Sequence, residues 1–327
     1  MSKKTFRRMV TLVPICLLSI GAASICRSVS PVGEPEFKEK WRVTSGIDTP
    51  VCAYADSESG NIYISMNPGG QDRKDGKGRI AKLSRDGKMM NPDWSVGLNA
   101  PKGMRRYRDT LWVADINEIA GINVTTGKAT SRTVVPGAKS LTGVAVADDG
   151  TVYVSDFRGD KIYSLHDGVI AAFVDDPVYN PPKRVVGGTL TQDPIGQAPR
   201  GILADGVSLV VGGWGQPEAR LMGYLYALNL KTKERTVLYP WPFASIDSIE
   251  GDGKGGYILG DGFAGTILRL PAHGLAPERL QKLKPGIGQI GFVLPGNLLL
   301  VPYTRGNMIV SYDISDALTY SEQNRRR

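Results

Sequence analysis

The sequence predicts an all-β fold, a six-bladed β-propeller of four-stranded antiparallel blades, on three observations. A short strand-like run recurs along the chain at the spacing of propeller blades. The same order of strands and turns surrounds each copy of this run. The last unit lacks its outer strand, and a matching strand, FKEKWRV (37–43), stands at the start of the body. The N-terminal strand is therefore expected to close the last blade.

The recurring run sets the period of the repeat. Its copies are NIYISMN (61–67), TLWVADI (110–116), TVYVSDF (151–157), SLVVGGW (208–214), GYILGDG (256–262) and NLLLVPY (297–303). Aligned at Ser65, Ala114, Ser155, Gly212, Gly260 and Pro302, they lie 49, 41, 57, 48 and 42 residues apart. A period of ~40–50 residues with several strands in each unit is typical of propeller blades.

Each unit begins with an inner strand, such as GVAVA (143–147), and continues through a tight turn into the recurring run. The turns are rich in Asp, Asn and Gly, which tolerate the left-handed backbone of hairpins. Third strands follow at GRIAKLS (78–84), KIYSLH (161–166) and TILRLP (266–271). Outer strands follow at RTVLYP (235–240) and ERLQKLK (278–284).

The sixth unit starts near Phe292 and ends after NMIVSYDI (307–314) without an outer strand. Pairing it with residues 37–43 removes an edge that would leave backbone groups unpaired. The propeller is thus predicted to span residues 37–316, followed by a basic tail at 317–327. A pair of β-sandwiches is the alternative, but it does not explain the divided unit.

Residues 1–26 have the pattern of a secretory signal peptide, with a basic start and an apolar run from Met9 to about Ile25. Cleavage is expected near residues 23–26, and a linker at 27–36. Export to the periplasm or outside the cell follows. The alternative is an uncleaved membrane anchor, for which the run is slightly short, and membrane contact is expected only through it. Of three cysteines, only Cys52 lies securely in the body, so the core must hold the fold.

The composition of the 327 residues, 41% hydrophobic with 40 glycines and 21 prolines, favours a globular protein with many turns. Its formal charge is +8, but four positive charges lie in residues 1–26 and three in residues 325–327. The body is nearly neutral and lacks the basic stripe of a nucleic-acid-binding domain. No nucleic-acid partner is expected, and the protein is expected to be a monomer.

Two runs, YVSDFRGDKI (153–162) and LWVADINEI (111–119), resemble the strand-ending motif of NHL-repeat propellers. The same runs also resemble sequences of the superfamily that contains senescence marker protein, gluconolactonase and strictosidine synthase. In the lactonases of that superfamily a calcium ion lies at the mouth of the central channel. The resemblance therefore implies a calcium site at the same place in this chain. Its ligands there are Asn and Asp from turns that enter inner strands, together with a glutamate near the first blade.

The corresponding turns of this chain are TPV (49–51), PKG (101–103), LTG (141–143), PRG (199–201), IDS (246–248) and GQI (288–290). Only Asp247 keeps a carboxylate. Lys102 and Arg200 place positive charge where the family has oxygen ligands, and a divalent cation is repelled by such neighbours. No cofactor is therefore expected, with calcium at Asp247 as the alternative.

The turns into inner strands and the loops between second and third strands fall on one face of a propeller. The ligand-binding candidates on this face are Lys102, Thr142, Arg200, Asp247, Gln289, Asp156, Arg158, Trp214, Asp261 and Tyr303. The first five are expected around the channel. The other five are expected farther out, together with Asp115, Asn117, Phe263 and Arg305. Lys102 and Arg200 suit a carboxylate or phosphate, unless nearby acids such as Asp247 merely neutralise them.

Some candidates also have a structural interpretation. Asp115, Asp156 and Asp261 recur at equivalent positions, which favours carboxylates that accept backbone N–H groups. Trp214 could stack on a ligand ring or pack between blades. The insertion at 175–199 is too polar and proline-rich for a strand pair and is expected over the channel mouth. The glycine-rich loop at 67–78 is expected to be solvated.

Several enzyme classes find no support. The two histidines, His166 and His273, follow third strands and are expected on the opposite face, so no Ser–His or Cys–His pair is expected at the channel. G-x-S-x-G and H-E-x-x-H motifs are absent from the sequence. The sequence therefore favours an exported propeller that binds a small anionic ligand or a protein partner without chemistry of its own. The alternative is a gluconolactonase-like hydrolase with a diverged metal site.

Overall fold

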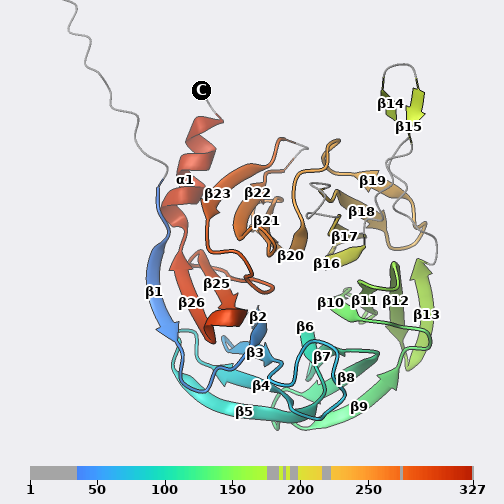
Figure 1. Ribbon diagram of the computed structural model, residues 1–327, viewed down its shortest axis with the longest axis vertical. Coiled ribbons are helices and arrows are strands. Elements are labelled where there is room, and N and C mark those ends of the chain that lie inside the picture. The colour runs from blue at the N-terminus through green and yellow to red at the C-terminus, as the bar shows by residue number, and fades with distance from the viewer. Residues whose placement is uncertain are drawn as a thin grey trace, which may run out of the picture. The chain divides into compact units, whose positions relative to one another are not determined.

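The computed structural model describes residues 35–174, 184–186, 189–191, 198–215, 222–272 and 275–325. Within this part of the chain, six four-stranded antiparallel sheets form a ring around a central axis (Figure 1). The predicted six-bladed propeller is confirmed. The predicted signal segment at 1–26 lies outside the described residues. Each helix in the described ranges is too short or too polar to cross a membrane.

The first three blades run from an inner to an outer strand in chain order. They comprise β2 (Pro50–Ala55), β3 (Ile62–Met66), β4 (Gly78–Leu83) and β5 (Met89–Leu98); β6 (Pro101–Tyr107), β7 (Thr110–Asp115), β8 (Glu118–Asn123) and β9 (Ala129–Val134); and β10 (Leu141–Val146), β11 (Val152–Asp156), β12 (Lys161–His166) and β13 (Val169–Val174).

The fourth and fifth blades repeat this order, and the sixth takes its outer strand from the N-terminal side. They comprise β16 (Pro199–Asp205), β17 (Ser208–Gly213), β18 (Leu225–Asn229) and β19 (Arg235–Val237); β20 (Ile246–Gly251), β21 (Tyr257–Asp261), β22 (Thr266–Leu270) and β23 (Glu278–Lys282); and β24 (Gly291–Val293), β25 (Leu298–Tyr303), β26 (Met308–Asp313) and β1 (Lys38–Val43). A short 3-10 helix, η2 (Thr304–Gly306), joins β25 to β26.

Strand β1 closes the ring as the sequence predicts. It pairs antiparallel with β26, from Lys38 opposite Asp313 to Val43 opposite Ile309. The ring of Trp41 also covers Gly87 in the turn between β4 and β5, where a Cβ would collide with the indole. Gly87 has a φ of +83°, so both the turn and this contact favour glycine. The closing strand therefore contacts the first blade as well as the sixth.

The core is divided among the interfaces between blades. In the described part of the chain, six clusters of buried apolar side chains each join two neighbouring blades. Between the third and fourth blades, for example, Tyr153 and Phe173 pack with Tyr226. Successive side chains of a strand point to opposite faces, so each sheet can pack against both neighbours. Blade packing thus fixes the positions of the loops at the ring axis.

Two segments differ from expectation. The chain forms helix α1 (Ser315–Asn324) where a basic tail was expected, and Ala317 and Leu318 are buried against the sixth blade's cluster. The insertion at 175–199 contains a strand pair, β14 (Arg184–Val186) with β15 (Thr189–Thr191), so the prediction that it is too polar for one was wrong. Its valines and threonines flank Gly187–Gly188 in the sequence, a pattern typical of hairpins. Whether the insertion covers the channel mouth stays a prediction.

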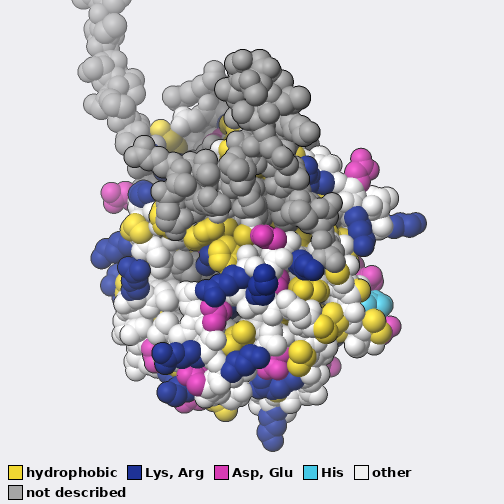
Figure 2. Space-filling view, turned by 45° about the vertical axis from the view of Figure 1, so that its right-hand side comes forward, with side chains coloured by type: hydrophobic (Ala, Val, Ile, Leu, Met, Phe, Trp, Pro, Cys, Tyr) yellow, Lys and Arg dark blue, Asp and Glu magenta, His cyan; other side chains and the backbone are white. Residues whose placement is uncertain are grey.

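Charged side chains are mixed over the surface. Figure 2 shows basic and acidic side chains beside one another across the described part of one face. Ion pairs on the surface include Arg42 with Glu39 at 2.6 Å and Arg132 with Glu118 at 2.6 Å. Such exposed pairs contribute little to stability, roughly 0–1 kcal/mol each. Another set of charged side chains lines the channel mouth near the ring axis.

Candidate functional site

The inner strands of five blades carry a bulge at the same end. The pairing register shifts near Val51 in β2, Lys102 in β6, Thr142 in β10, Arg200 in β16 and Asp247 in β20. A bulge redirects a side chain, and each of these five residues lines a cavity at the channel mouth. The repeat thus places one side chain from each of these strands at the axis.

Glycines let the inner strands approach one another. A Cβ at Gly103 would collide with the carbonyl oxygen of Thr142, and one at Gly143 with that of Arg200. The pattern of a cavity-lining residue followed by glycine therefore has a packing cause. It also explains why the turns of different blades could be aligned in the sequence.

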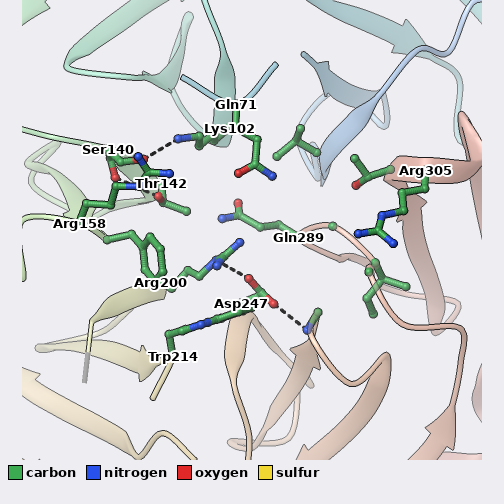
Figure 3. Close-up of a pocket in the computed structure, with 17 residues that line it drawn as sticks. Gln71, Lys102, Ser140, Thr142, Arg158, Arg200, Trp214, Asp247, Gln289 and Arg305 are labelled. Carbon is green, nitrogen blue, oxygen red and sulfur yellow. Dashed lines mark hydrogen bonds and ion pairs between the residues drawn. The ribbon is translucent and has the colours of Figure 1, made fainter. Parts of the chain in front are cut away.

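The cavity has a volume of about 230 Å³ and receives side chains from all six blades (Figure 3). The structure brings together the five residues expected at the axis, Lys102, Thr142, Arg200, Asp247 and Gln289, and adds the predicted Arg158 and Trp214. Arg305 also lines it, although Arg158, Trp214 and Arg305 were all expected farther from the axis. Asp115, Asn117 and Phe263 do not.

Three predicted ligand-binding residues lie away from the cavity. Asp156 is buried and accepts hydrogen bonds from the backbone N–H groups of Lys139 and Ser140, both at 2.8 Å. Asp261 accepts the N–H groups of two backbone positions in the same way. The hydroxyl of Tyr303 lies 2.9 Å from that of Tyr312. The structural interpretation of the recurrent aspartates is confirmed, and their assignment to a ligand is not supported by their position.

Arg200 is held on three sides. Its Nε is in ion-pair contact with Oδ1 of Asp247. Its guanidinium carbon lies 4.0 Å from the ring centroid of Trp214 and 4.8 Å from that of Phe157. Cation–π attraction from both rings favours the charged guanidinium at this place. Its two terminal nitrogens donate to no group in the described part of the chain, so they are available to a ligand.

Asp247 is a buried acid beside this arginine. Its Oδ2 accepts a hydrogen bond of 2.6 Å from the N–H of Gly262. Burial raises the pKa of Asp247 to about 7, although Arg200 and the Gly262 N–H favour the ionised form. Asp247 therefore gains and loses its proton near neutral pH.

A second group of charges gathers around Asp72. The buried Lys102 places Nζ 2.8 Å from Oγ of Ser140 and 3.3 Å from Oδ1 of Asp72. Arg158 pairs with the other oxygen of the same carboxylate at 3.0 Å. Burial lowers the pKa of Lys102, repulsion from Arg158 and Arg200 lowers it further, and Asp72 opposes both effects. Two cations thus share one carboxylate and repel one another.

Several contributors to the site, among them Gln71, Asp72, Ser140 and Phe157, were missed in the sequence. Gln71 lines the cavity and Asp72 pairs there, although the loop at 67–78 was expected to be merely solvated. Ser140 and Phe157 were also not singled out. The available signal was the position of the loop, because it joins the second and third strands of its blade, as the loop that holds Arg158 does.

The cavity side chains do not fit the calcium site that the resemblance to the lactonases implies. Among the described residues, no three His, Cys, Asp or Glu side chains gather as metal ligands would. Asp247, the one carboxylate retained in the aligned turns, faces a guanidinium. A divalent cation requires several oxygen ligands and is repelled by such a neighbour. His166 does not line the cavity, and its Nδ1 lies 2.8 Å from Oγ1 of Thr151. His273 lies outside the described residues.

Below the cavity the channel narrows. A space of about 10 Å³, enough for one water, lies between the inner strands. Beyond Asp247 along the strands, Arg105 of β6 pairs with Glu250 of β20 at 2.8 Å, and both side chains are largely buried. These strands belong to the second and fifth blades, which face each other across a six-membered ring. The pair therefore bridges the channel.

Comparison with known proteins gives a fold and no family. No protein-family model matches the chain, and no curated protein matches it. Among solved structures, virginiamycin B lyase from Staphylococcus aureus is similar, with 16% identity, a TM-score of 0.52 and coverage of 81% of this chain and 80% of that one. A streptogramin B lyase has 14% identity, a TM-score of 0.54 and coverage of 85% and 97%.

A chain of a nidogen/laminin complex is similar as well, with 17% identity, a TM-score of 0.56 and coverage of 74% of this chain and 88% of that one. These three structures, which are examples of a larger set, include lyases and a component of a protein–protein complex. One fold hosts many functions. At these identities the likeness shows that the chain shares the six-bladed β-propeller fold with them.

Proposed function

We propose that this propeller binds a small anionic molecule at the mouth of its channel and performs no chemistry on it. The cavity of about 230 Å³ is smaller than pockets for drug-sized ligands, which have ~300–1,000 Å³. It therefore suits a small metabolite-sized molecule rather than a large cofactor.

The observation that carries this proposal is the imbalance of charge around the cavity. Four cationic side chains line it, namely Lys102, Arg158, Arg200 and Arg305. Two carboxylates contact them, Asp72 and Asp247. Arg305 forms no ion pair within the described ranges. Positive charge in a partly buried site is stabilised by an anion that also accepts hydrogen bonds.

Hydrogen-bonding groups are also left open toward the cavity. Gln289 is 9% exposed, and Figure 3 shows its side chain directed to the middle of the site. Its amide makes no side-chain hydrogen bond to a described residue. A ligand that pairs with this amide exchanges its hydrogen bonds to solvent for direct ones, a net gain of roughly 0.5–1.5 kcal/mol for each.

A binding experiment tests the proposal. A panel of small carboxylates and phosphates is titrated into the purified protein by calorimetry, and thermal unfolding is followed in parallel. Arg200→Gln and Lys102→Met are expected to weaken binding about 10–100-fold, the effect of losing one charged hydrogen bond. Arg42→Gln is the matched control, since Arg42 pairs with Glu39 on the outer strand of a blade. A panel without binders, or unchanged affinity in both cavity variants, contradicts the proposal.

One observation favours the alternative of a gluconolactonase-like hydrolase with a diverged metal site. The pKa of Asp247, about 7, is suited to a general base at neutral pH. Lactone hydrolysis is therefore measured with calcium and with EDTA. Turnover that Asp247→Asn abolishes would replace the binding proposal by the hydrolase. A protein partner that presents a carboxylate to the same face is distinguished by the failure of small anions to bind.

We further propose that the protein acts as a monomer outside the cytoplasm. Residues 1–26 carry the signal-peptide pattern that supports this proposal. N-terminal sequencing of the mature protein is expected to start near residues 24–27. A full-length chain retained in the membrane fraction would instead support the anchor. Size-exclusion chromatography with light scattering measures the oligomeric state.

A further inference from the structure

We infer that the ligand is a small dianion with its two anionic groups at opposite ends and a neutral polar group between them. One end lies against Arg305 and the other against the cationic cluster, defined as Lys102, Arg158 and Arg200. The inference rests on the proposed anion binding and names the ligand class.

The cations that line the cavity lie on two opposite sides of it. Arg305 lies in η2 of the sixth blade, whereas Arg158 follows β11 of the third blade. The third and sixth blades face each other across the ring. Figure 3 shows Arg305 on one side of the cavity, the cationic cluster on the other and Gln289 between them. Because charged hydrogen bonds are short, ~2.7–2.9 Å, we assign a separate anionic group to each of the two sides.

The balance of charge leads to the same class. Asp72 forms ion pairs with both Lys102 and Arg158, and Asp247 forms one with Arg200. Arg305 has no carboxylate partner in the described part of the chain. The four cations thus exceed the two carboxylates by two charges when Asp247 is ionised. A dianion neutralises this excess, whereas a monoanion leaves one cation uncompensated after water is displaced.

The middle of the cavity is neutral and polar. Gln289 carries a carbonyl oxygen and an NH₂ group, and its amide has no partner among the described residues. It can therefore donate to a ligand carbonyl or accept from a ligand hydroxyl. The fitting class is a short dicarboxylate with a hydroxyl or carbonyl group on the chain.

The test compares acids of equal size and different charge. Succinate and succinamate, and glutarate and glutaramate, have the same number of heavy atoms, but each amide lacks one charge. Calorimetry at low ionic strength is expected to give at least tenfold tighter binding of the diacids, because salt screens such attraction.

Arg305→Gln assigns the second end. This variant is expected to bind succinate no better than succinamate, because the second carboxylate then has no cation to pair with. Arg42→Gln is the control and should keep the preference for diacids. Malate is expected to bind more tightly than succinate, and Gln289→Leu should remove that difference.

The outcomes separate the two proposals. Tight binding of amides and diacids alike overturns the dianion and leaves anion binding intact. A preference for diacids that survives Arg305→Gln overturns the assignment of the second end to Arg305. If no acid or amide binds, and the wider panel of anions also fails, the proposed function itself is wrong.

Discussion

Asp247 is the residue whose proton most affects the charge of the cavity. It is buried, faces Arg200 and accepts a hydrogen bond from the N–H of Gly262. Burial still prevails and raises the pKa of its carboxyl to about 7, from 3.8 in an unfolded chain. The folded protein therefore binds this proton more tightly than the unfolded chain does, and the ionised form costs stability.

The sign of the pH dependence follows. Between pH 4 and pH 7 the unfolded carboxyl is ionised while the folded one keeps its proton, so the free energy of unfolding falls as pH rises. The variant Asp247→Asn has no ionisable group at this position, so its free energy of unfolding does not fall for this reason as pH rises. Its stability relative to the wild type is expected to increase by about 2–3 kcal/mol from pH 5 to pH 8. Thermal unfolding at four pH values measures it, and parallel curves for both proteins would contradict the assigned pKa.

Single residues also show how far the sequence could predict the site. Lys102, Arg200 and Asp247 were found because they occupy equivalent turns of a repeat. Asp72 was not found, because it lies in a loop that differs in length from its counterparts and pairs with Lys102 from 30 residues away. A repeat pattern predicts positions, whereas ion pairs between blades depend on loop conformations that have no periodic signal.

At the level of the strand, the recurrent aspartate at the end of a second strand connects that strand to the loop before the inner strand. Its carboxylate accepts hydrogen bonds from backbone N–H groups of this loop. In the second blade, Asp115 ends β7 and accepts the N–H of Asn99 at 2.8 Å and of Ala100 at 2.6 Å. Asp115 is fully buried. The carboxylate thus fixes the entry of β6, which carries Lys102 to the channel.

Asp115→Ala is expected to lower the free energy of unfolding by about 2–4 kcal/mol, because two backbone N–H groups lose their acceptor in a buried place. Asp115→Asn keeps one acceptor oxygen and should lose less. Chemical denaturation measures both. Asp109→Ala, in the exposed turn between β6 and β7, is the matched control. An equal loss in the control and in Asp115→Ala would contradict this role.

The two elements that the repeat did not predict are α1 and the hairpin of β14 and β15. Both lie outside the repeated unit, so no aligned copy could reveal them. Helix α1 is fixed by tertiary contacts, since the buried Arg269 of β22 lies 3.4 Å from Oγ of Ser321 and donates to Asp252 at 2.8 Å. The strands of the blades were predictable because their period is a property of sequence alone.

Across the whole molecule, the ring depends on the pairing of β1 with β26. Trp41 and Val43 of this strand, and Phe37 just before it, pack against neighbouring apolar clusters. A chain that begins at Thr44 loses these contacts and leaves the edge of β26 unpaired. Its free energy of unfolding is expected to fall by about 3–5 kcal/mol, and the open edge favours self-association. Denaturation and light scattering measure both.

A synthetic peptide of residues 35–45 should restore part of the lost stability in the shortened chain. The same residues in scrambled order are the control. If the shortened chain is as stable as the full one, closure by β1 does not hold the ring together.

The Arg105–Glu250 pair has a consequence for exchange with solvent. Because this pair joins opposite blades below the cavity, a molecule held above it enters and departs by one route only. Its residence time is then set at that single opening. An antibody bound over the opening would trap the occupant, whereas one bound to the reverse side of the ring would leave its release rate unchanged.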